Sequence, residues 1–594
     1  MSESTELDYF NKSKGSRPGQ YAGLNSDGIL LDRVLYTRER SYADRVDSQS
    51  KKEPGSSFFT YPNFDSLASF LSSPFRFPPT KDAVTVEHQE HAYGPDAFVQ
   101  FSTYLPGQAS PSRLGIKSLD TLKLSLDNVL SHGGGSTTVF LQGWQPPDWL
   151  NVIGDRLQLE PEFFQRHLEF RSRDTAASTE RFSDFSLPSS KTQMMQLKLT
   201  TLGTRFAPEG QSHNDDQKKL SKLRGEVNEL TRKYCEKWDP YNSSHEQGTS
   251  IARAFSVHDL RHVSLEQDVS IYVRARTSQD DHWIAIIWID VGNGFGRDDG
   301  GPWNSPLMKY NGMPVKYWPT TQHRPGVFFD ERHFTQRQCQ YSDANRISQN
   351  ASLLPEASDV LLDPEAFMED AYYGLSNIFR FSAASEAQFL DMCQHLLDED
   401  MKPSTLSTPE VNKTLTVWNL VYNKQILDRH VQYLEDICEF LEAKESNDWP
   451  CATSGHAKKT AEITNCLVMR DYKKLRQRAA KLSEDYWQST SMLTNAAMID
   501  ESQKAMNQAD GVVKLTTLAF FFVPLTFSTS IFGMNLQEIN DGSKAKFWVW
   551  LLTAGGLLLF TLVGLEWVSH RLRPFKPWQH WWKKNPAKRS LSAV

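Results

Sequence analysis

The sequence predicts an α/β domain followed by a long stalk helix and two transmembrane α-helices. Three observations predict this class. Strand-like apolar runs alternate with helical patterns over residues 76–375, apolar residues recur at helical spacing over residues 376–514, and two apolar runs near the C-terminus lack charged side chains. The order of these segments places the soluble mass of the chain before its membrane part.

Length and composition narrow the class of protein. The chain has 594 residues, too many for one compact domain, and its formal net charge of -7 argues against a nucleic-acid-binding protein that relies on overall basicity. We therefore expect no nucleic-acid partner. The six cysteines lie far apart without a C-x-x-C pair, so neither a disulfide framework nor a zinc site is indicated. No nucleophile, carboxylate pair or metal-ligand spacing forms a recognisable constellation, so we do not expect an enzyme.

The first part of the chain divides into a leader and a domain. Residues 1–75 mix polar residues with scattered aromatic ones, and we expect a mobile polar leader. Residues 76–375 are expected to form an α/β cytoplasmic domain with loop insertions. Strands are predicted at 137–144, 269–276 and 282–291, and a helix at 160–170, where Pro161 suits a first turn.

Helical periodicity dominates the next part of the chain. We expect a helical region over residues 376–456 and a stalk helix over residues 457–514. No proline interrupts the second pattern before Pro524, so one helix can continue from the stalk into the membrane. The alternative is a hinge near Gly511, which would separate a soluble helix from a membrane helix.

Two apolar runs are predicted to cross a membrane. Residues 515–537 contain no Asp, Glu, Lys or Arg, and as a helix they would be about 34 Å long, enough for the hydrocarbon core of a bilayer. A short outer loop at 538–546 leads to a second crossing over 547–568 and a basic tail over 569–594. Because basic tails stay in the cytoplasm, we expect a multi-pass integral membrane protein with both termini cytoplasmic, in the plasma membrane rather than an organelle.

A specific motif ends the first crossing. Its residues are Pro524, Leu525, Thr526 and Phe527, then Gly533, Met534 and Asn535. The segment resembles the signature of the CorA-type magnesium transporters, and the resemblance covers about residues 510–570. Phe532 departs from the family pattern, which usually has Tyr before Gly-Met-Asn.

The resemblance implies a homopentamer in a lipid bilayer, with a central pore lined by the first membrane helix of each subunit. Magnesium would be the transported ion, driven by the membrane potential. Because magnesium holds its water tightly, its filter should contact the hydrated ion with neutral oxygens. The expected selectivity filter is Gly533, Met534 and Asn535. The expected pore-lining residues are Thr529, Thr526, Val523, Ala519 and Leu515, and those of the outer mouth are Glu538 and Asp541.

The resemblance also implies feedback by magnesium bound between cytoplasmic domains. Asp500, Glu501 and Asp510 are candidate ligands, because facing carboxylates of neighbouring subunits repel unless a cation neutralises them. Magnesium is therefore a candidate regulatory ion as well as the cargo. The alternative function is a membrane-anchored interaction or sensing protein, which would retain a CorA-like membrane hairpin while the large N-terminal region carries the task.

Overall fold

The computed structural model describes most of the chain. The described residues are 41–76, 97–169, 187, 192–206, 213–275, 282–323, 349–402, 413–533 and 547–571, with short gaps inside several of these ranges. By internal contacts the chain divides into two units, Met1–Ser491 and Met492–Val594.

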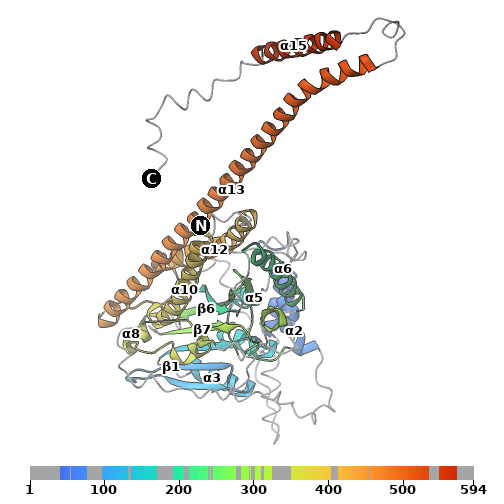
Figure 1. Ribbon diagram of the computed structural model, residues 1–594. Helices are drawn as coiled ribbons and strands as arrows, with labels where there is room; N and C mark the ends of the chain where they lie inside the picture. The colour runs from blue at the N-terminus through green and yellow to red at the C-terminus, as the bar shows by residue number, and fades with distance from the viewer. Residues whose placement is uncertain are drawn as a thin grey trace, which may run out of the picture. The chain divides into compact units, whose positions relative to one another are not determined.

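A mixed β-sheet forms the centre of the first unit (Figure 1). Its strands are β1 (Val99–Tyr104), β2 (Ser112–Ile116), β3 (Ser136–Gln142), β4 (Met194–Thr204), β5 (Ala254–Val257), β6 (His262–Ala275), β7 (Trp283–Ile289) and β8 (Lys316–Tyr317). They are ordered β2-β1-β3-β7-β6-β4-β8, and β5 pairs with β6. β3 and β7 are parallel, and the other described pairs are antiparallel. Every residue of β7 is buried, as expected for a central strand covered on both faces.

Helices cover both faces of the sheet. Those from the N-terminal half are α2 (Asp65–Arg76), α3 (Leu119–Ser131), α4 (Pro147–Leu157), α5 (Pro161–Leu168) and α6 (His213–Lys237). Those that follow the sheet are α7 (Leu354–Ala357), α8 (Pro364–Glu369), α9 (Ala371–Gly374), α10 (Ser376–Asp400) and α12 (Lys413–Glu442). Short 3-10 helices occupy Pro62–Phe64, Pro302–Asn304, Pro306–Met308, Asn350–Leu353 and Lys444–Ser446.

The central strand β7 shows how the two helical layers are separated. Because side chains alternate along a strand, neighbouring residues of β7 enter opposite layers. Ile286 and Trp288 join a core that includes residues of α2 to α6. Trp283 instead donates a hydrogen bond from Nε1 to the Phe367 carbonyl, 2.9 Å away on α8. The predicted α/β class is confirmed, as are the strands at β3, β6 and β7 and the helix that begins at Pro161.

The N-terminal region differs from the predicted leader. Residues 41–50 are helical, and both Tyr42 and Val46 are buried in the core of the first unit. In α2, Leu67 and Leu71 are fully buried, because their spacing places them on one face of the helix. The part of the leader that the structure describes is therefore integral to the α/β domain. Polar neighbours hid this amphipathic pattern in the sequence.

A layer of three helices forms the later part of the first unit. α13 (Gly455–Gly533) begins here, and its residues up to 491 belong to this unit. Tyr472 donates to the Phe379 carbonyl at 2.9 Å, and Tyr486 donates to the Cys393 carbonyl at 2.8 Å, both on α10. Since both partners advance by the same number of residues, α10 and α13 run parallel. Ion pairs of Lys473 with Glu442 and of Arg478 with Asp391 reinforce the layer.

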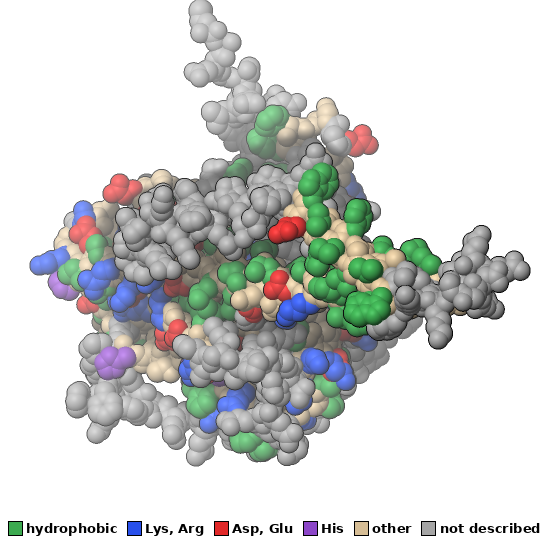
Figure 2. All heavy atoms as spheres, turned by 45° about the horizontal axis from the view of Figure 1, so that its top comes forward, with side chains coloured by type: hydrophobic (Ala, Val, Ile, Leu, Met, Phe, Trp, Pro, Cys, Tyr) green, Lys and Arg blue, Asp and Glu red, His purple; other side chains and the backbone are tan. Residues whose placement is uncertain are grey.

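The second unit contains the end of α13 and the helix α15 (Phe547–Arg571). α13 is unbroken at Gly511, so the alternative of a hinge there is wrong for this structure. Within the described residues, α13 contains a segment long and apolar enough to cross a membrane, while the apolar stretch of α15, Trp550–Gly564, is shorter. Hydrophobic side chains lie open on the surface of these helices (Figure 2); Phe560, for example, is 79% exposed.

Candidate functional site

The predicted pore-lining residues share one face of α13. At about 100° per residue, the five positions from Leu515 to Thr529 fall within an arc of about 120°. All five are exposed within the single chain, Leu515 by 68% and Val523 by 63%. The helix therefore presents a continuous face, apolar at one end and hydroxylated at the other, that no described part of the chain covers.

Two positions on the opposite side of the same segment are buried, while Phe520 and Phe521 on that side are about 40% exposed. Pro524 and Ser528 are the buried residues of α13 between 515 and 533, and they lie about 160° from the centre of the pore-lining arc. On α15, Ala554 is the described residue that is buried. The described residues thus cover two positions behind the predicted pore face and leave that face open.

The two threonines of the open face orient their hydroxyl groups in a defined way. Thr526 Oγ1 donates to the Phe522 carbonyl at 2.8 Å, and Thr529 Oγ1 donates to the Thr526 carbonyl at 2.9 Å. Because each hydroxyl proton is used inside the helix, the oxygen lone pairs remain available as acceptors. Acceptors are what the water shell of a hydrated cation requires, since its water hydrogens point outwards.

The predicted filter lies at the end of α13. Gly533 is the last residue of the helix, and a Cβ added there meets no atom within 4 Å. Nothing described within one chain therefore requires a glycine at this position. Met534 and Asn535 lie outside the described residues, and so do Glu538 and Asp541 of the predicted outer mouth.

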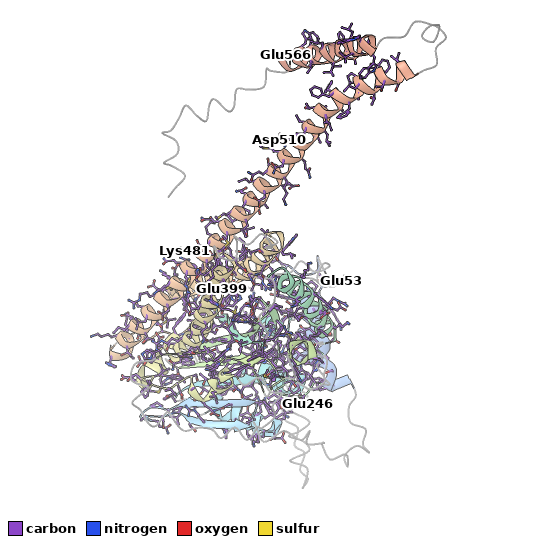
Figure 3. All side chains as sticks on the ribbon, viewed as in Figure 1. Glu53, Glu246, Glu399, Lys481, Asp510 and Glu566 are labelled. Carbon is purple, nitrogen blue, oxygen red and sulfur yellow. The ribbon has the colours of Figure 1, made fainter. Side chains whose placement is uncertain are left out.

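The predicted regulatory carboxylates do not converge within one chain. Asp500, Glu501 and Asp510 are all exposed on α13, and Figure 3 marks Asp510 on this stretch of the helix. At about 100° per residue, Glu501 and Asp510 point in opposite directions. An ion bound by these carboxylates would need further ligands from outside the chain.

A buried ionic network that the sequence did not predict joins the sheet to α10 and α12. Lys198 Nζ lies 3.0 Å from Glu266 Oε2, and Nε2 of His430 lies 3.6 Å from Oε1 of the same glutamate. His430 Nδ1 lies 2.6 Å from Glu386 Oε1. Burial alone would lower the pKa of His430, but Glu386 and Glu266 raise it to about 9. The histidine is therefore held as a cation between two buried carboxylates.

A second buried network has the connectivity of a hydrolase triad. His167 Nδ1 lies 2.8 Å from Ser270 Oγ, and its Nε2 lies 3.2 Å from Asp290 Oδ1. Arg253 also binds Asp290, with its Nε 2.7 Å from Oδ2. All three triad-like residues are buried, so this cluster links α5 to β6 and the end of β7, and the Ser270 hydroxyl is not accessible to a substrate.

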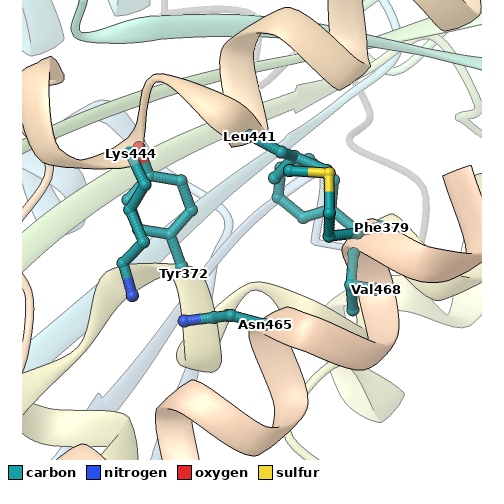
Figure 4. A pocket seen from close by; sticks show the side chains of 7 residues that line it. Tyr372, Phe379, Leu441, Lys444, Asn465 and Val468 are labelled. Atoms are coloured by element: carbon teal, nitrogen blue, oxygen red, sulfur yellow. The ribbon is translucent and has the colours of Figure 1, made fainter. Parts of the chain in front are cut away.

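A narrow pocket lies between α9, α10, α12 and the first part of α13 (Figure 4). Tyr372, Phe379, Leu441 and Val468 supply its apolar wall, with Lys444 and Asn465 at its polar side. Lys444 Nζ is already paired with Asp370 at 3.1 Å. The Tyr372 hydroxyl accepts a hydrogen bond from Asn447 Nδ2 at 2.9 Å. Among the described residues, Asn465 Nδ2 is the buried lining atom of this pocket without a hydrogen-bond partner.

Comparison with known proteins finds a family match over most of α13 and α15. Residues 460–568 match the family model described as CorA-like Mg2+ transporter protein. The solved structure of the full-length CmaX protein aligns with 81% of this chain and 99% of its own, at 13% identity and a TM-score of 0.30. No curated protein sequence matches the chain. Residues 460–568 thus form a domain of the CorA-like Mg2+ transporter family.

Proposed function

We propose that the protein is a channel for magnesium or a related divalent cation, in which several copies of the chain surround one pore. The family domain supports cation transport across a membrane. The observation that carries the proposal is the open face of α13, where the five predicted pore-lining residues are exposed while Pro524 and Ser528 behind them are buried. A ring of identical subunits would turn this face into the wall of a pore.

The proposed pore is a homopentamer with a filter at Gly533, Met534 and Asn535. Five Asn535 amides would offer neutral oxygens to a hydrated ion, which avoids the large cost of removing magnesium's inner water shell. Gly533 would allow neighbouring chains to approach closely, and among the described residues no atom lies within 4 Å of a Cβ added there.

Below the filter, the proposed pathway changes from polar to apolar. Thr529 and Thr526 would contact the water shell through their lone pairs. Val523, Ala519 and Leu515 would then form a narrow apolar neck that closes the pore by excluding water. Passive flux through this pathway would be driven by the membrane potential, which acts on each divalent ion with about 4.6 kcal/mol per 100 mV.

The proposed topology has two membrane crossings with both termini in the cytoplasm, at the plasma membrane. α15 would make the second crossing, with Glu566 (labelled in Figure 3) near its polar end. In a ring of subunits, Asp500, Glu501 or Asp510 could face a carboxylate of the next copy and bind a regulatory magnesium ion that favours the shut state.

A membrane-anchored interaction or sensing protein is the second candidate. The observation that favours it is the size of the first unit, which has its own sheet, helical layers and core. Such a protein would keep the hairpin as an anchor without conducting ions.

Reconstitution separates the two candidates. Purified protein in liposomes that contain a magnesium-sensitive dye should admit magnesium when a negative internal potential is imposed, and images of the detergent-purified particle should show five-fold symmetry. Protein-free liposomes are the control. Absence of flux from correctly inserted particles would reject the channel and favour the anchored protein.

A further inference from the structure

A separate group of metal-binding side chains lies at the start of α13, within the first unit. Its members are Asp363, Glu365 and His456, and one potential ligand atom from each lies within 4.8 Å of the others. Asp363 precedes α8, Glu365 belongs to its first turn, and His456 belongs to the first turn of α13. Asp363 is half-buried and the other two are exposed, so the group is open to solvent.

The backbone around Asp363 is fixed by hydrogen bonds. Its Oδ1 caps α8 by accepting from the Ala366 N–H at 2.9 Å, which leaves the other carboxylate oxygen for a ligand. Its own N–H donates to the Tyr373 hydroxyl at 2.7 Å. α8 in turn packs on β1 and β3. One side of the group is therefore attached to the central sheet.

Hydrogen bonds also fix residues that precede His456 in the chain. The Ala371 N–H donates to the Pro450 carbonyl at 2.9 Å, and Trp449 Nε1 donates to the Gln193 carbonyl at 3.1 Å. Gly455, directly before His456, has a φ of 73°, a left-handed conformation that suits glycine and turns the chain into α13. These contacts and the turn at Gly455 bring the start of α13 to α8.

The electrostatics of the group favour a bound cation. Within the described residues, neither Asp363 nor Glu365 forms an ion pair with a lysine or arginine, whereas Asp370, Glu442 and Asp391 each do. Two carboxylates held close together repel unless a cation neutralises their charge. A divalent cation would neutralise both carboxylates and accept the imidazole lone pair.

The ligand types indicate the class of metal. Imidazole together with carboxylates suits first-row transition ions such as Zn²⁺, Mn²⁺ or Co²⁺, whereas Mg²⁺ prefers oxygen ligands and keeps its waters. We propose that Asp363, Glu365 and His456 bind one divalent transition-metal ion and thereby tie the first turn of α13 to the α/β domain. Water would complete the coordination shell at this exposed position.

This site would give the channel a sensor for a second kind of ion. The regulatory meaning rests on the proposed function, because α13 is the helix whose other end would line the pore. The binding site itself does not depend on the pore, since all three ligands belong to the first unit.

Metal binding to purified full-length protein tests the proposal. After treatment with a chelator, the protein is titrated with Zn²⁺ against a chromophoric chelator, and with Co²⁺ while its visible absorption is recorded. The variants are His456→Gln, Glu365→Gln and Asp363→Asn, the last of which keeps a good helix cap. Each should weaken binding by at least about tenfold, since even outer-shell changes cost 10- to 100-fold in affinity.

Two controls make the result specific. Glu462→Gln removes an equal charge from the same helix, where its carboxylate lies 3.9 Å from Lys458, and should bind like the parent. Asn535→Ala alters the proposed filter and should also retain this site. Unchanged Zn²⁺ and Co²⁺ affinity in the His456→Gln/Glu365→Gln double variant would overturn the site. Because the readout is binding and not flux, this result and a failure of the channel proposal are distinguishable.

Discussion

The helix α13 is packed against other helices in its first part and is mostly exposed in its last part. In its first part, Ala479 and Leu482 are almost fully buried against the α10 and α12 layer, and Tyr486 donates to an α10 carbonyl. In its last part, Leu515 and Val523 are mostly exposed. An apolar helix face needs cover, which the chain supplies to the first part and does not supply to the open face of the last. The first part should therefore control folding, and the last part should control assembly and flux.

The largest expected effect on folding comes from a matched pair of leucines. Leu482→Ala should lower the free energy of unfolding by about 2–5 kcal/mol, because the leucine is buried and its removal leaves a cavity. Leu515→Ala should lower it by no more than about 0.5 kcal/mol, because this side chain is exposed within the chain. Denaturant unfolding of the first unit in the full-length protein measures both. Equal losses in the two variants would contradict the contrast between the two parts of α13.

A second effect on folding depends on pH through His430. Its pKa of about 9 in the folded protein exceeds its ordinary value, so its charged pairing stabilises the fold fully below about pH 6.5, and this contribution is lost as the pH rises through about 9. The free energy by which the parent exceeds His430→Gln should therefore shrink between pH 6.5 and 9. Unfolding titrations at both pH values measure this difference. A constant difference would show that the histidine is not held charged between Glu386 and Glu266.

His258 should change the stability with pH in the opposite direction to His430. Burial lowers its pKa to about 4, so its contribution grows as the pH rises from about 4 to 6.5 and is constant above that range. The two histidines thus act in separate windows of pH. Subtracting the free energy of unfolding of His430→Gln from that of the parent at each pH cancels the contribution of His258, which both proteins share.

The next smaller effect concerns regulation along the exposed stretch of α13. Neutralising the three stalk carboxylates together, as Asp500→Asn, Glu501→Gln and Asp510→Asn, should reduce inhibition by internal magnesium without changing the unfolding of the first unit. Patch recordings with varied internal magnesium measure this. If inhibition is unchanged, the regulatory ion binds elsewhere.

The smallest expected effect concerns the outer mouth. Glu538→Gln and Asp541→Asn should slow magnesium uptake mainly at low ionic strength, because carboxylates raise the local cation concentration through an attraction that salt screens. Uptake measured at low and high salt tests this. A loss that is equal at both salt concentrations would indicate direct contact with the ion instead.

Much of the fold could be predicted from residue patterns. The apolar run of β7 and the proline at the start of α5 identify elements locally, because burial and backbone geometry act on neighbouring residues. The helix pattern without a proline before Pro524 also predicted the continuity of α13. The core role of Tyr42 and Leu67 was missed, because their polar surroundings resemble a leader and their partners lie far along the chain.

In the candidate sites, too, contacts between residues far apart in the sequence could not be predicted. The open face of α13 follows from helical spacing alone, but the burial of Ser528 behind it depends on the fold of the hairpin. No sequence pattern marks Glu266 and Lys198, because only the packing of α12 brings His430 to Glu266. Asp363 and His456 form no motif in the sequence, because the fold alone brings α8 to the start of α13.

The central claim is that the end of α13 forms a filter for a hydrated divalent ion, and one substitution tests it most directly. Asn535→Ala should purify as the same oligomer, with the same unfolding of its first unit, and lose nearly all magnesium flux in dye-loaded liposomes, because the proposed pentamer would lose five neutral oxygens from its pore mouth at once. Asn540→Ala, also polar but outside the triplet, should keep most of the flux. If Asn535→Ala conducts magnesium like the parent, the filter is not at Gly-Met-Asn, and the membrane-anchored interaction protein becomes the better account.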